Sequence, residues 1–260
     1  MVKPKKHLGQ HFLKDETISE EIVSSLQSLD NTGTVLEVGP GTGALTKYLQ
    51  NKEVNFLAFE IDRESISFLA SNYPNVRVDN QDILSYDFNL FKSKPISIIG
   101  NFPYNISSQI LFKAIENRSE VNQLVGMFQK EVAERVASPP GSKKYGILSV
   151  LVQAYFHTEY LFTVDEDSFI PPPKVKSGVI RMLRNNIKTL DCDEKLFFKI
   201  VKTTFNQRRK MIRNSIRVIT GKLDSDHELF SKRPEQLSVD NFITLTNYTQ
   251  SIIKNIDSNQ

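Results

Sequence analysis

The sequence predicts an α/β protein, with a Rossmann-like domain followed by a small all-helical domain. From residue 16 to about residue 184, short apolar segments bounded by turn residues alternate with amphipathic helical segments. A glycine-rich turn follows the first strongly apolar segment, as in domains that bind nucleotide-type cofactors. Beyond Asn185 the apolar residues recur only at helical spacing. We therefore expect one domain over residues 1–185 and a second over residues 186–260.

The elements of the first domain are expected in strict alternation. Each predicted strand is a short run rich in β-branched and aromatic residues, and each predicted helix has an apolar stripe. The expected strands are 34–38, 54–59, 75–78, 95–99, 121–128 and 178–183, and the expected helices are 16–29, 44–50, 63–72, 107–116 and 130–136. This alternation predicts an open, mostly parallel sheet covered on both faces.

Composition excludes several classes of protein. With 260 residues and 39% hydrophobic content, the chain is long enough for one large core and a small appended unit. The single cysteine, Cys192, cannot form an internal disulfide or a cysteine zinc site. Polar residues interrupt the longest apolar stretch, 147–164, and no apolar run follows the basic start. We expect a soluble, cytoplasmic monomer without a metal.

The charge is distributed unevenly along the chain. Nine of the 33 basic residues lie between Lys195 and Leu223, a stretch that contains no Asp or Glu. The remaining 24 basic residues are outnumbered by the 30 acidic ones. A mildly acidic body with one strongly basic segment predicts a polyanionic partner.

The glycine-rich turn runs from Gly39 to Gly43 and opens the expected helix 44–50. Glycines at such a position allow a sharp turn and close approach of a ligand. The loop also fits a loose dinucleotide fingerprint, with Glu60 as the acid that binds ribose. Pro40 removes one backbone N–H, which makes a pyrophosphate site less attractive. Taken alone, the loop fits a nucleotide-type cofactor or an ordinary tight turn.

Polar side chains follow successive predicted strands. Glu60, Asp82 and Asn101 each lie just after such a strand or at its end, where an open α/β sheet binds its ligands. Glu60 could accept hydrogen bonds from ribose hydroxyls, and Asp82 from an exocyclic adenine amine. Each residue alone fits a helix cap or a turn equally well, but the three together favour a ligand site.

Asn101-Phe102-Pro103-Tyr104 is the most specific motif in the chain. It resembles the Asn/Asp-Pro-Pro-Tyr type motif of amino methyltransferases. The N6 amine of adenine is a poor nucleophile because its lone pair is delocalised into the ring. Two acceptors at its hydrogens, the Asn101 side-chain oxygen and the Phe102 carbonyl, would favour a pyramidal nitrogen. Pro103 would stiffen the turn, and Tyr104 would stack on an extruded base. We expect these four residues to be catalytic, by positioning and electrostatics.

Further segments resemble one family, the small-subunit (16S) ribosomal RNA adenine N6,N6-dimethyltransferases. They span residues 8–214 and comprise Leu8-Gly-Gln-His-Phe-Leu13, Gln129-Lys-Glu-Val-Ala-Glu-Arg135, Tyr145-Gly-Ile-Leu-Ser149, Phe169-Ile-Pro-Pro-Pro-Lys-Val-Lys-Ser177 and Phe205-Asn-Gln-Arg-Arg-Lys210. His11 stands where the family usually has Asn, and Phe102 where Leu is commoner.

The resemblance implies a class I methyltransferase domain that uses S-adenosylmethionine. It implies that this cofactor is held by His11, Leu13, Gly39, Gly41, Glu60, Asp82 and Asn101. It also implies dimethylation of two adjacent adenosines in the 3′-terminal hairpin of 16S rRNA in the 30S particle, a step of ribosome biogenesis.

The basic segment is expected to contact that RNA. Arg209, Arg213 and Arg217 would share one face of a helix over 205–217, with apolar residues on another face. A cationic stripe over an apolar anchor suits phosphate contacts. The expected RNA-binding residues are Arg208, Arg209, Lys210, Arg213 and Arg217.

Three alternatives remain at this level. A macrolide-resistance enzyme that methylates 23S rRNA would share the cofactor loop and the Asn101 motif. A nucleic-acid-binding factor on an inactive methyltransferase fold would not need Asn101, Tyr104, Glu60 and Asp82 intact. The third alternative, an NAD-dependent enzyme, is supported by the glycine loop alone.

Overall fold

The computed structural model describes residues 2–221 and 227–257. The chain divides into two compact units, the first comprising Met1–Glu134 and Phe156–Arg184, the second Arg135–Tyr155 and Asn185–Gln260. The break after Arg184 coincides with the change in the sequence pattern. The segment 135–155 belongs to the second unit, a feature that the sequence pattern did not indicate.

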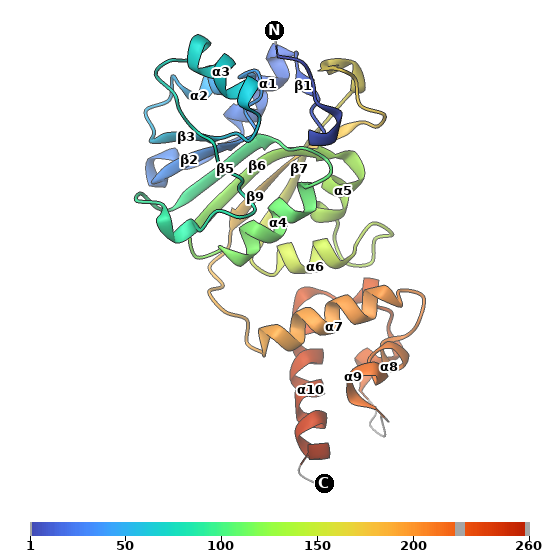
Figure 1. The fold of residues 1–260 in the computed structure, drawn as a ribbon. Helices are drawn as coiled ribbons and strands as arrows, with labels where there is room; N and C mark the ends of the chain where they lie inside the picture. Colours follow the sequence, from blue (N-terminus) through green and yellow to red (C-terminus); the bar gives the residue numbers. More distant parts are fainter. Residues whose placement is uncertain (1, 222–226, 258–260) are drawn as a thin grey trace. The chain divides into compact units, whose positions relative to one another are not determined.

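A seven-stranded sheet in the order β4-β3-β2-β5-β6-β9-β7 forms the centre of the first unit (Figure 1). Strands β4, β3, β2, β5 and β6 are parallel, and β9 is antiparallel to β6 and β7. The strands are β2 Thr34–Val38, β3 Phe56–Phe59, β4 Arg77–Asp79, β5 Ile96–Asn101, β6 Val121–Gln129, β7 Phe156–Val164 and β9 Ser177–Arg184. The expectation of an open, mostly parallel sheet is confirmed.

Helices cover both faces of this sheet, which explains why every residue of β2 is buried. Helices α1 (Glu16–Ser24), α2 (Thr46–Leu49) and α3 (Arg63–Asn72) lie on one side, and α4 (Ser107–Glu116) and α5 (Lys130–Ala137) on the other (Figure 1). Side-chain caps fix two of the starts: Asp15 accepts from the N–H groups of Thr17 and Ile18, and Asp62 accepts from that of Glu64.

Three features of the first unit differ from the sequence expectation. The helix expected over 16–29 ends at Ser24. Strand β7 was not expected, because its apolar residues do not alternate regularly with polar ones and its pairing with β9 shifts register between Tyr160 and Phe162. A two-stranded ribbon pairs β1 (Phe12–Leu13) with β8 (Phe169–Ile170), and two-residue strands have no readable periodicity.

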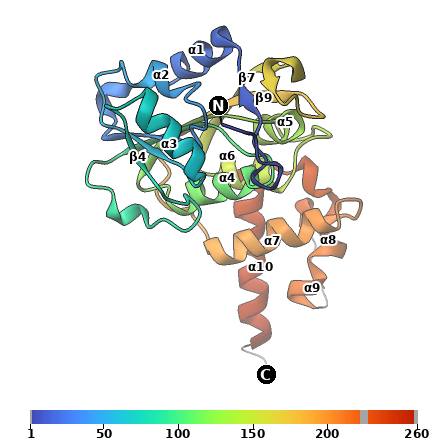
Figure 2. The ribbon, with the colours of Figure 1, turned by 45° about the horizontal axis from the view of Figure 1, so that its top comes forward.

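The described part of the second unit contains helices without a strand. They are α6 Ile147–Gln153, α7 Glu194–Asn206, α8 Ile212–Ser215, α9 Arg217–Thr220 and α10 Val239–Asp257. Helix α10 packs on α7 (Figure 2). The ring of Phe242 lies against those of Phe197 and Phe205. Lys222, counted in the basic stretch, lies outside the described residues.

The prediction of a single helix over residues 205–217 is wrong. Helix α7 ends at Asn206, and a turn then leads to the short helices α8 and α9. The N–H of Ile212 donates to the carbonyl of Lys232 at 2.8 Å, and that of Lys210 to Gln207 at 2.7 Å. In a continuous helix, Arg209, Arg213 and Arg217 would lie four residues apart on one face and would repel one another. Within residues 2–221 and 227–257, no helix is long and apolar enough to cross a membrane.

The buried amide of Gln123 on β6 ties the segment after α1 to the sheet. Its Oε1 accepts from the N–H of Gln27 at 3.0 Å, and its Nε2 donates to the Gln27 carbonyl at 2.5 Å. Gln123 is 1% exposed, so water cannot replace these bonds.

We predict that Gln123→Leu lowers the free energy of unfolding by about 1–3 kcal/mol, because two backbone groups lose their partner. Urea denaturation measures this loss. The control Gln50→Leu, at an exposed position, should change stability by less than about 0.5 kcal/mol. Equal losses in the two variants would contradict the structural role of Gln123.

Candidate active site

A pocket opens at the carboxyl ends of β2, β3 and β5. The order of the strands reverses between β2 and β5, which is where open α/β sheets bind ligands. The pocket is lined by the glycine loop after β2, the end of β3, the Asp82 loop, residues 101–106 and the N-terminal segment 8–13. The structure thus brings together every residue expected to hold a cofactor or to act in catalysis.

The glycine loop adopts a conformation that requires glycine. Gly39 and Gly41 have φ of 68° and 57°, in the left-handed region. A Cβ on Gly39 would meet nothing within 4 Å, so its open side faces free space in the pocket. A Cβ on Gly41 would lie 2.9 Å from the ring of Phe12. The loop therefore forms a cradle whose free side can accept a ligand.

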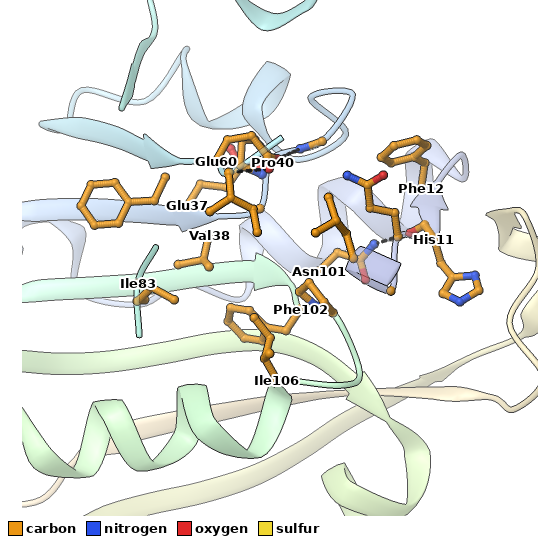
Figure 3. Close-up of a pocket in the computed structure, with 18 of the residues that line it drawn as sticks. His11, Phe12, Glu37, Val38, Pro40, Glu60, Ile83, Asn101, Phe102 and Ile106 are labelled. Carbon is orange, nitrogen blue, oxygen red and sulfur yellow. Dashed lines mark hydrogen bonds between the residues drawn. The ribbon is translucent and has the colours of Figure 1, made fainter. Parts of the chain in front are cut away.

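Glu60 holds this loop in place. Its carboxylate accepts from the N–H groups of Gly41 at 3.0 Å, Ile61 at 2.8 Å and Asp62 at 2.9 Å. Burial raises the pKa of Glu60, and these three N–H donors oppose that rise. Since Oε1 already accepts two bonds, Oε2, which accepts one, has the greater remaining capacity for a ligand hydroxyl. Figure 3 shows Glu60 beside Pro40 at the wall of the pocket.

Glu37, at the end of β2, was not singled out in the sequence. It is 1% exposed and accepts a 2.6 Å hydrogen bond from the hydroxyl of Thr46. Burial raises its pKa to about 8, and the bond from Thr46 opposes the rise. A carboxyl directly before a glycine loop, on a buried strand, is the signal that could have identified it.

The amide of Asn101 is held in one orientation. Its Nδ2 donates to the backbone carbonyl of His11 at 2.8 Å. A carbonyl only accepts, so the NH₂ end must face His11 and Oδ1 is directed to the other side. Figure 3 shows this bond, with the His11 imidazole pointing away from Glu37 and Glu60. His11 thus orients Asn101 through its backbone carbonyl.

Phe102 and Pro103 form the rigid turn after Asn101. The Phe102 side chain is 1% exposed, and its N–H donates to the carbonyl of Met127 at 3.2 Å. Pro103 restricts the backbone of the preceding residue to extended conformations. The Phe102 carbonyl therefore has little freedom to turn.

Tyr104 is hydrogen-bonded to the first residue of β9. Its hydroxyl lies 2.5 Å from Ser177 Oγ, and burial raises its pKa. The ring of His11 stacks on Tyr104 with centroids 5.7 Å apart, and His11 Nδ1 lies 2.7 Å from the carbonyl of Pro171. Because that carbonyl only accepts, Nδ1 is the protonated nitrogen. These partners come from distant segments and could not be predicted from local sequence.

The N-terminal segment is fastened across the pocket at both ends. Lys5 Nζ lies 2.5 Å from Asp62 Oδ1, and Gln10 Nε2 donates to Asp62 Oδ2 at 3.2 Å. Burial would raise the pKa of Asp62, but the bonds from Lys5 and Gln10 hold it below its usual value. Leu13 lines the pocket and also packs into the hydrophobic core. The segment closes one side of the pocket.

Asp82 is exposed on the loop after β4 and contributes to the pocket lining. Its Oδ1 accepts from the N–H of Leu84 at 2.9 Å, a turn-forming bond of the kind that the sequence left open as an alternative. Oδ2 forms no such bond within the turn and can still accept from a ligand.

The basic residues of the second unit fall into two groups. Arg208 donates to the carbonyls of Ser142 at 3.3 Å and Lys143 at 2.8 Å, so its guanidinium supports the unit's own loop. Arg209, Lys210, Arg213 and Arg217 are exposed. Among the described residues, no three His, Cys, Asp or Glu side chains are grouped as metal ligands would be.

We predict that Glu37 makes stability depend on pH. Its folded-state pKa of about 8 exceeds the ordinary value of 4.5, so the folded protein holds a proton that the unfolded chain releases. This stabilisation is complete below pH 4.5 and is lost as pH rises through about 8. Between pH 4.5 and about 8, the free energy of unfolding of the wild type should fall by up to about 1.4 kcal/mol per pH unit relative to that of Glu37→Gln, which cannot titrate at this position. Urea denaturation at several pH values measures this difference. If the free energies of unfolding of the two proteins changed in parallel with pH, the prediction would be contradicted.

The chain is similar to curated proteins over nearly its whole length. It is 56% identical over 250 residues to "Ribosomal RNA small subunit methyltransferase A" of Flavobacterium johnsoniae, covering 94% of this chain and 95% of that protein. It is 54% identical over 260 residues to the protein of the same name from Bacteroides thetaiotaomicron, covering 98% and 97%.

Solved structures share the fold. A dimethyladenosine transferase from Plasmodium falciparum superimposes with a TM-score of 0.77 at 23% identity, covering 93% of this chain and 98% of that one. The 23S rRNA methyltransferase ErmE gives a TM-score of 0.68 at 24% identity, covering 91% and 99%. The model of the family "Ribosomal RNA adenine dimethylase" matches residues 1–253. With the pocket and the Asn101 turn described above, the chain belongs to the ribosomal RNA adenine dimethylase family.

Proposed function

We propose that this protein transfers methyl groups from S-adenosylmethionine to N6 of two adjacent adenosines in the 3′-terminal hairpin of 16S rRNA, within the 30S particle. The products are N6,N6-dimethyladenosines. The observation that carries the proposal is the fixed Asn101-Phe102 turn at the edge of the pocket, whose two oxygens suit the two hydrogens of an adenine amine. Relatives that cover nearly the whole chain are named as small-subunit enzymes, which favours 16S over 23S rRNA.

The pocket residues fit the methyl donor. The open side of Gly39 leaves room for a ligand against the backbone, and Pro40 offers no N–H to a phosphate, so a cofactor without a pyrophosphate suits the loop. We assign Glu60 Oε2 to a ribose hydroxyl and Asp82 to the adenine amine. Gly39, Gly41, Leu13, His11 and Asn101 complete the cofactor site. When bound, S-adenosylmethionine supplies a methyl group on a positively charged sulfur.

The residues of the turn prepare the acceptor amine. Asn101 Oδ1 and the Phe102 carbonyl accept from the two N6 hydrogens, which localises the lone pair on nitrogen. Tyr104 stacks on the extruded adenine and keeps it in the pocket, with its hydroxyl held at Ser177. Since both oxygens are held before the base arrives, the reaction needs no reorganisation of the turn.

The second domain, from residue 186 on, is proposed to bind the rRNA. Arg209, Lys210, Arg213 and Arg217 are exposed and suited to phosphate contacts, which position an RNA without reading its sequence. Arg208, which is half-buried, supports this unit through its bonds to the carbonyls of residues 142 and 143. We propose that the enzyme acts as a monomer in the cytoplasm, on the assembled particle.

We predict that Asn101→Ala lowers methyl transfer by on the order of 10²-fold or more, because one acceptor is lost. RNA binding should be unchanged. Incorporation of radiolabelled methyl groups into unmodified 30S particles measures transfer, and filter binding measures affinity. Asn51→Ala, at an exposed position, is the matched control and should behave as the wild type. Equal loss of transfer and RNA binding in Asn101→Ala would count against the proposed role.

We predict that Arg209→Ala/Lys210→Ala weakens RNA binding and reduces its salt dependence. Each lost phosphate contact should lower the slope of log K against log salt by about 0.7–0.9. The control Lys52→Ala/Lys92→Ala removes the same charge from exposed sites before β3 and β5, at the amino edge of the sheet. A slope that stays the same in the first variant, or falls equally in both, would remove this segment from the interface.

A further inference from the structure

The ring of Phe102 lies in a slot between two glycines on adjacent strands. Gly100 on β5 pairs in register with Gly126 on β6. A Cβ on Gly100 would lie 2.7 Å from Phe102 Cε1, and one on Gly126 would lie 2.0 Å from Phe102 Cε2. The ring of Phe128 packs nearby, with centroids 5.0 Å apart. The catalytic turn is thus anchored in the sheet by one aromatic ring.

The ring of Phe102, and not the backbone conformation, explains why residue 126 is a glycine. Its φ lies outside the left-handed region, so other residues could adopt its conformation. The three atoms nearest to an added Cβ are Cε2, Cδ2 and Cζ of Phe102, at 2.0, 2.7 and 2.9 Å. Even one methyl group at position 126 would have to displace the ring.

Displacing the ring would move the acceptor carbonyl. The position of Phe102 is set by its seated ring and by the bond from its N–H to the carbonyl of Met127, the residue after Gly126. Pro103 leaves residue 102 only a narrow range of backbone conformations. The Phe102 ring is 1% exposed and packs against Phe128, so it has little space to rotate into and a displacement strains the backbone. A misplacement of about 1 Å can cost about 10²-fold in rate.

We propose that Gly126 is a positioning residue for methyl transfer: by carrying no side chain it seats the Phe102 ring and thereby aims the Phe102 carbonyl at the adenine amine. This inference rests on the proposed function. Because Gly126 acts on the acceptor side of the pocket, its substitution should lower the rate of transfer without changing the affinity for the cofactor.

The test compares Gly126→Ala with its combination with Phe102→Leu. Gly126→Ala should lower kcat for transfer to unmodified 30S particles about 10–100-fold, while the Kd of S-adenosylmethionine by calorimetry stays within about twofold. The smaller, rotatable leucine leaves room for the methyl group. Gly126→Ala/Phe102→Leu should therefore return to within about threefold of Phe102→Leu alone.

Gly100→Ala is the matched control, because its Cβ would also meet the carbonyl of Val38 at 2.7 Å. The added methyl group of Gly100→Ala would clash with both Phe102 and the Val38 carbonyl. Phe102→Leu removes only the first of these clashes, so it should fail to rescue Gly100→Ala. A wild-type kcat in Gly126→Ala would overturn the proposal. So would a result in which Phe102→Leu rescues both glycine variants equally, or rescues neither of them.

Thermal unfolding separates failure of this inference from failure of the proposed function. Phe102→Leu should relieve the drop in Tm caused by Gly126→Ala, whether or not the substrate is correct. If the wild type transfers no methyl group to the particles, the proposed function is contradicted. If Tm shows no such coupling, the slot itself is contradicted.

Discussion

The site depends on the hydrogen bond from Asn101 Nδ2 to the carbonyl of His11. An amide free to rotate would offer a donor as readily as an acceptor, and a donor would repel the hydrogens of an adenine amine. By holding the NH₂ end, the N-terminal segment decides which end of Asn101 is available. The same segment closes the pocket proposed to hold the cofactor and is fastened to Asp62 through Lys5 and Gln10. In the proposed mechanism, one piece of chain therefore prepares both the cofactor side and the acceptor side of the site.

Around this bond the sheet supplies rigidity. The glycine loop is tied to Glu60 by the N–H of Gly41, and Glu37 lies buried below it with Thr46 as a partner. On the acceptor side, the Phe102 ring is held between glycines of β5 and β6. Preorganised polar groups act best where they cannot relax, and each of these groups has a partner whose position the fold fixes.

Local signals made the sheet and most of the pocket predictable. The glycine loop, Glu60 and Asn101 each follow a strand, and the carboxyl ends of parallel strands meet at one edge. What sequence could not give depends on contacts between distant segments. Neither the His11 carbonyl opposite Asn101 nor the joining of segment 135–155 to the second unit has a local signature. The break in the basic helix has the same origin, since the Ile212 N–H bonds to Lys232.

A crystal structure of the protein with adenosine and S-adenosylhomocysteine would test the orientation of the turn directly. The distances from adenosine N6 to Asn101 Oδ1 and to the Phe102 carbonyl should both lie in the hydrogen-bond range of about 2.7–3.2 Å, with Nδ2 still on His11. An adenosine bound in the pocket with either oxygen turned away from N6 would contradict the account.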